Sequence, residues 1–155
     1  MTLPEPQFDD LYRELILDHY RRPRNRGGLA VATRRAEGVN PVCGDEIKLD
    51  LLLNDDVIED IAFSGQGCSI SQASASMLTD RVKGKTTAEA NHVLGRVRAM
   101  LMDGEAPGPD LGDLESLEGV ARLPVRVKCA MLCWNVLQEG LNTPANVARE
   151  EPTHD

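Results

Sequence analysis

The chain has 155 residues, about the length of one domain, and its 17 basic and 25 acidic side chains give a net charge of -8. This acidic balance argues against a nucleic-acid binder, because phosphate contacts need a basic face. No apolar run approaches the length of a membrane span, and residues 1–10 are polar and acidic rather than signal-like, so we expect a cytoplasmic protein. In a reducing cytosol its four cysteines are better explained as metal ligands or reactive thiols than as a disulfide framework.

Apolar periodicity and turn-forming residues predict an α+β fold. Ile47, Leu49 and Leu51 alternate with polar residues, which is typical of a strand with one buried face. The expected elements, in chain order, are a helix over 8–21, strands over 33–39, 45–54 and 57–63, a helix from 69 to about 82, a helix over 87–103, a short acidic helix or turn over 111–120, and a helix from 124 to about 138. We therefore expect a small antiparallel sheet of about three strands packed against a set of helices.

The ends of two helices carry typical signals. Ser69 and Gln72 form a candidate capping box where the second helix begins, and Gly140 is expected to cap the last helix. After this glycine the chain is polar and contains two prolines. We expect one domain over 8–140, followed by a disordered tail over 141–155.

Three cysteines and an aspartate stand in turn-like surroundings and form the candidate functional site. Cys43 and Asp45 lie two residues apart where a turn enters a strand, so both side chains can point the same way. Cys68 directly precedes a helix and Cys129 lies in the first turn of another, where the helix dipole stabilises a thiolate. Three thiolates and one carboxylate make a four-coordinate set for a soft or borderline metal.

The residue types alone leave two questions open. Spacing gives metal ligation and the simple burial of small apolar cysteines about equal weight, because the chain has no compact Cys-x-x-Cys pair. If a metal does bind, charge counting does not distinguish zinc from an oxidised 2Fe–2S core, since both carry the same charge. Cys133 is expected to be a packed core residue, and His19 to pack, cap or contact a partner.

Four segments of the chain carry a recognisable pattern. They are Asn-Pro-Val-Cys-Gly-Asp at 40–45, Phe-Ser-Gly-Gln-Gly-Cys-Ser-Ile-Ser at 63–71, Arg-Val-Lys-Cys-Ala at 126–130, and the stretch from 11 to 25. This pattern resembles the IscU/NifU-type iron–sulfur cluster assembly superfamily, and the resemblance covers about 8–140. Lys128 stands where the scaffold-type members place a histidine, and the stretch between Cys68 and Cys129 is longer than in those scaffolds. Both features are similar to the SufU branch of the superfamily.

Similarity to SufU implies a zinc-dependent sulfurtransferase that accepts persulfide sulfur on Cys43 from a SufS-type cysteine desulfurase. A downstream cluster scaffold would be a further partner. Carried over position by position, the zinc ligands are Cys43, Asp45, Cys68 and Cys129. Arg126 is expected to stabilise negative charge during the transfer. The alternative implied by the wider superfamily is a scaffold protein that assembles a 2Fe–2S cluster on the same four ligands.

Overall fold

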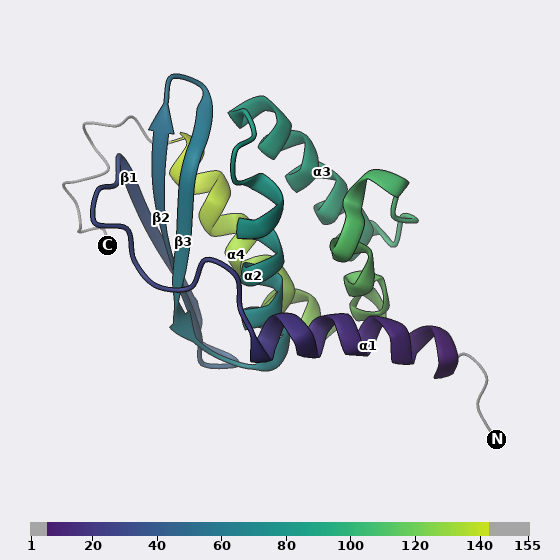
Figure 1. Cartoon of the computed structure of the whole chain (residues 1–155). Helices are drawn as coiled ribbons and strands as arrows, with labels where there is room; N and C mark the ends of the chain where they lie inside the picture. The colour runs from purple at the N-terminus through teal and green to yellow at the C-terminus, as the bar shows by residue number, and fades with distance from the viewer. Residues whose placement is uncertain (1–5, 143–155) are drawn as a thin grey trace.

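A three-stranded antiparallel sheet forms one side of the protein, and the helices pack against one of its faces (Figure 1). The computed structural model describes residues 6–142, so residues 143–155 of the expected tail lie outside the described part. The elements are α1 (Pro6–Arg21), β1 (Arg34–Asn40), β2 (Asp45–Asn54), β3 (Val57–Gln66), α2 (Ser69–Val82), α3 (Thr87–Asp103), the 3₁₀ segment η1 (Pro109–Arg122) and α4 (Pro124–Asn142). The predicted α+β fold is confirmed, while the domain boundaries at 8 and 140 stay a prediction.

The sheet is a meander in the order β1-β2-β3. Asn40 pairs with Asp45 at the end of the first hairpin, so the turn that carries Cys43 lies directly beyond this pair. Alternate side chains of β2 enter the core as predicted, and Ile47, Leu49 and Leu51 are fully buried. The predicted alternation weakens at a register shift between Leu52 and Leu53, where both side chains are half-buried, although Leu53 still packs against the core.

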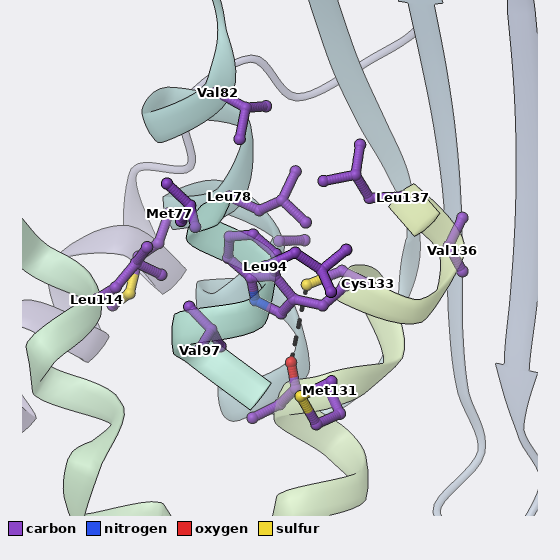
Figure 2. Packing of buried hydrophobic residues seen from close by; sticks show 14 of the residues in the cluster. Met77, Leu78, Val82, Leu94, Val97, Leu114, Met131, Cys133, Val136 and Leu137 are labelled. Carbon is purple, nitrogen blue, oxygen red and sulfur yellow. Dashed lines mark hydrogen bonds between the residues drawn. The ribbon is translucent and has the colours of Figure 1, made fainter. Parts of the chain in front are cut away.

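Helices α4 and α2 cover the inner face of the sheet, and α3 and η1 pack farther from it (Figure 1). The contact among α2, α3 and α4 is apolar. Leu78 of α2 and Leu94 and Val97 of α3 converge with Cys133 and Leu137 of α4 (Figure 2). Burial of such side chains is the main favourable contribution to folding. Within the described helices, no segment is long and apolar enough to cross a membrane.

Both predicted helix-end signals were wrong. Cys68 itself is the N-cap of α2, and no side chain caps this helix. Gly140 lies inside α4, which continues to Asn142. A Cβ atom at Gly140 would approach Leu51 Cδ1 to 3.2 Å, so glycine serves close packing of the helix on the sheet rather than helix termination.

His19 attaches α1 to the rest of the protein. Its side chain is buried, with Nδ1 at 2.8 Å from Ser76 Oγ and Nε2 at 3.0 Å from Asp113 Oδ2. The packing role expected for His19 is therefore confirmed. A second acidic residue of η1 contacts the same helix, since Glu118 accepts a hydrogen bond from Tyr12 of α1.

Candidate metal centre

Four chain segments meet at one end of the sheet and bring the predicted ligands together. Cys43 lies in the β1–β2 turn, and Asp45 is the first residue of β2. The turn is tight, since the Asn40 carbonyl accepts hydrogen bonds from the backbone N–H groups of both Cys43 and Gly44. Gly44 has a φ of 75°, a left-handed conformation that glycine adopts without strain. Cys129 reaches the same place from α4, as the sixth residue of that helix and therefore in its second turn rather than in the first turn expected from the sequence.

Three of the four predicted ligands lie within coordination range of one point. The ligand atoms of Cys43, Asp45 and Cys129 are all within 4.8 Å of one another. The sulfur atoms of Cys43 and Cys129 are 3.4 Å apart. Asp45 and Cys129 are buried, whereas Cys43 is half-buried. The sequence prediction that Cys43 and Asp45 point the same way is consistent with this geometry.

Cys68 is the fourth predicted ligand. It lies beside the group of Cys43, Asp45 and Cys129 but is not one of the three residues whose ligand atoms are within 4.8 Å of one another. Its backbone N–H donates a hydrogen bond of 3.0 Å to Asp45 Oδ1. Its side chain lies near enough to Cys129 to contribute to the raised pKa of that thiol. Because Cys68 is the half-buried N-cap of α2, its side chain lies where the helix dipole favours an anion.

Without a bound cation, the candidate metal centre disfavours the negatively charged form of the Cys129 thiol. The pKa of Cys129 is raised well above its usual range, first by burial and then by the neighbouring side chains of Asp45, Cys43 and Cys68. The exposed Arg126 lies beside the same groups, and its hydrogen bond with Cys129 and the charge of Cys68 raise the pKa of its guanidinium. The residue predicted to stabilise negative charge is thus next to the thiols.

The side chains present fit a bound metal ion. Asp45 Oδ1 accepts from Cys68, but Asp45 Oδ2 is buried and has no hydrogen-bond partner in the described part of the chain. A buried carboxylate oxygen without a partner is costly, and a cation beside the thiols would satisfy it. Sulfur-rich donor sets select zinc or iron–sulfur clusters over hard cations such as magnesium.

Gly67 gives a direct test of the Asp45–Cys68 hydrogen bond. Its φ of +155° disfavours other residues, and a Cβ atom there would collide with Asp45 Oδ1 and lie 2.6 Å from Ser71 Oγ. Gly67→Ala is therefore expected to displace the Asp45 carboxylate and to weaken metal binding, with zinc as the probe, by at least about tenfold, as outer-shell changes do. Competition with a chromophoric chelator measures this affinity.

Gly84→Ala is the matched control for Gly67→Ala. Gly84 also has a positive φ, of 81°, but a Cβ atom there would have no neighbour within 4 Å. Its substitution strains the backbone without approaching the metal centre. Equal zinc affinity of Gly67→Ala and the wild type would show that Asp45 does not depend on this close packing.

Sequence reasoning missed Asn40, and it correctly set Cys133 apart from the site. Asn40 is 8% exposed and closes the turn that holds Cys43, and its only signal is its place at the start of the Asn-Pro-Val-Cys-Gly-Asp segment. Cys133 is fully buried in the core (Figure 2), where burial raises the pKa of its thiol to about 12. The expected packing role of Cys133 is confirmed.

The fold and the site define a thiol-rich metal-binding domain, in which a small antiparallel sheet presents cysteines and an aspartate at one end. The sequence profile of the NifU-like N terminal domain matches residues 11–146. The chain therefore belongs to the family of NifU-like N-terminal domains, and within it the chain is SufU- and IscU-like.

Similar proteins carry two different functional names. The zinc-dependent sulfurtransferase SufU of Bacillus subtilis is 44% identical over 146 residues, covering 93% of this chain and 94% of that protein. The iron–sulfur cluster assembly scaffold protein IscU of Streptococcus pyogenes is 42% identical over 141 residues, covering 90% and 88%. A solved structure described as an iron–sulfur cluster assembly scaffold for the SUF system, from Fervidobacterium islandicum, has a TM-score of 0.79 at 34% identity and covers 83% and 95% of the two chains. The resemblance found in the sequence is confirmed.

Proposed function

We propose that this protein acts in iron–sulfur cluster assembly as a cytoplasmic, zinc-dependent sulfurtransferase that receives persulfide sulfur from a SufS-type cysteine desulfurase. The observation that carries the proposal is the unequal burial of the site: Asp45 and Cys129 are buried, while Cys43 is half-buried in a turn. Its neighbour Val42 is 75% exposed. A partner can therefore reach Cys43 while Asp45 and Cys129 stay covered.

Zinc would be held by Cys43, Asp45, Cys68 and Cys129. When bound, zinc keeps the thiols deprotonated near neutral pH and introduces no redox chemistry of its own. Lys128 supports zinc over a cluster, because the scaffold-type members that this chain resembles have a histidine at that position. A protonated lysine has no lone pair with which to bind metal.

The transfer is a thiol–disulfide type of exchange on Cys43. Its thiolate attacks the outer sulfur of the persulfide on the partner's cysteine, and a new sulfur–sulfur bond forms. The sulfur–sulfur bond in the partner breaks, and its electron pair leaves on the partner's thiolate. The persulfide proton stays with the transferred sulfur, so no external oxidant or reductant is needed. Arg126, beside Cys68 and Cys129, stabilises the negative charge during this exchange.

Alanine release by the cognate cysteine desulfurase tests this function. With cysteine as substrate and a reductant present, the zinc-loaded wild type is expected to accelerate alanine release, because it removes the persulfide that limits turnover. Cys43→Ala is expected to leave only the rate of the desulfurase alone. Cys133→Ala removes a different, fully buried cysteine and should retain the acceleration.

Three results would contradict the proposal or one of its parts. If the wild type gave no acceleration but formed a 2Fe–2S cluster when iron and sulfide were supplied, the protein would be a scaffold on the same ligands. Brown protein on aerobic purification, instead of colourless zinc protein, would point the same way. Arg126→Ala with an undiminished transfer rate would refute the role given to that guanidinium.

A further inference from the structure

A pocket of about 260 Å³ opens next to the metal centre, between the end of β1, the C-terminal half of α3 and α4. Its apolar wall includes Val39, Met102 and Leu132. Its polar wall is formed by residues with hydrogen-bond donors, among them Asn40, Arg98 and Lys128. The sulfur-transfer mechanism uses none of these side chains.

Asn40 supplies a buried donor in this wall. Its side chain is 8% exposed, and its Oδ1 accepts a hydrogen bond from the backbone N–H of Val42. Its Nδ2 is buried and has no hydrogen-bond partner anywhere in the described residues. Leaving such a donor unpaired costs about 1–3 kcal/mol, so the pocket favours a ligand that carries an acceptor oxygen.

The pocket is also positively charged in an acidic protein. The chain has a net charge of -8, yet the pocket lining contains no aspartate or glutamate. Arg98 donates to the neutral side chains of Asn135 and Gln138, at 2.9 and 3.0 Å, so its charge is not neutralised by these contacts. Lys128 forms no salt bridge with any residue between 11 and 142. A carboxylate is therefore the ligand group that suits this lining.

We propose that the pocket receives an acidic side chain of the sulfur-donating partner, an inference that rests on the proposed function. The pocket adjoins the reactive thiol, because the Asn40 carbonyl accepts from the N–H of Cys43 and Lys128 directly precedes Cys129. A protein that reaches Cys43 would cover it. The exposed rim residues Val39 and Met102, each 61% exposed, suit apolar side chains flanking that carboxylate. A small free acid would leave this rim uncovered.

The binding of zinc-loaded protein to the cognate desulfurase, measured by calorimetric titration, tests this docking site separately from catalysis. Lys128→Glu is expected to raise the dissociation constant at least about tenfold, because it places like charges together. Lys128→Arg should bind like the wild type. Met102→Glu, on a different helix from the metal ligands, should weaken binding in the same direction. Zinc content, measured for each variant, should stay at the wild-type level.

Lys85→Glu is the matched control. Lys85 follows the C-terminal end of α2, whereas Cys68 precedes its N-terminal end, so the same charge change is made far from the metal centre. Unchanged affinity in both Lys128→Glu and Met102→Glu would overturn the docking site. So would glutarate binding to the free protein that is lost in Lys128→Glu while desulfurase affinity is unchanged, because the pocket would then hold small acids. If Lys128→Glu weakened binding to the desulfurase but the wild type did not accelerate alanine release, the docking site would be supported and the sulfurtransferase function would be refuted.

Discussion

Asp45→Asn is expected to lose most of its zinc while the surrounding backbone stays in place. Asparagine keeps an oxygen that can accept from the Cys68 N–H, the contact made by Asp45 Oδ1 at 3.0 Å. It replaces the other oxygen, which is buried and unpartnered, by an amide nitrogen that cannot ligate. Loss of a direct ligand should weaken zinc binding by at least about 100-fold, the upper range for outer-shell changes.

Chelator competition measures that affinity, and zinc per chain after gel filtration gives a second reading. Asp50→Asn makes the same chemical change on the same strand, where the carboxylate accepts from the backbone N–H of Leu29 and lies 3.4 Å from Arg35. It should bind zinc normally. Wild-type zinc affinity in Asp45→Asn would remove Asp45 from the ligand set and leave the thiols as the protein's donors.

Trp134→Ala is expected to lower the free energy of unfolding by about 3–5 kcal/mol. Trp134 is fully buried in α4, and it is the largest side chain in the core. Its Nε1–H also donates to Ser74 Oγ at 3.2 Å, which ties α4 to α2. Removal of the indole leaves a cavity that the close-packed neighbours fill only in part.

Urea unfolding followed by circular dichroism measures the change, because the substitution removes the only tryptophan of the chain. Trp134→Phe is the control: it keeps most of the ring volume and loses the hydrogen bond, so it should cost less than Trp134→Ala. A loss of less than about 1 kcal/mol in Trp134→Ala would show that the core collapses around the site far more readily than packed interiors do.

Elements with strong local signals were predicted at their observed bounds. The strand over 45–54 and the helix over 87–103 match β2 and α3, because alternation and helical periodicity are properties of neighbouring residues. The role of Gly140 was not predictable in the same way. What decides it is a side chain about ninety positions earlier, Leu51, whose approach to the helix is a tertiary contact.

The candidate ligands could be named from the sequence, but their surroundings could not. Cys43, Asp45 and Cys129 were recognisable by residue type and motif, and the structure brings their ligand atoms together. The pocket beside them is formed by side chains from β1, α3 and α4, so no single segment carries its pattern. The lone donor of Asn40 becomes visible only when all its neighbours are in place.

Asp45 has one oxygen tied to the backbone of Cys68 and the other oxygen unpaired. The hydrogen bond from Cys68 therefore holds the carboxylate in position whether or not the other oxygen binds an ion. If such a donor lets go of an ion, it stays within reach, so recapture is intramolecular and has a high effective concentration. In the proposed reaction Cys43 must be exposed to the partner and recovered in every cycle, and a carboxylate held in position in this way would let the remaining ligands adjust without loss of the ion.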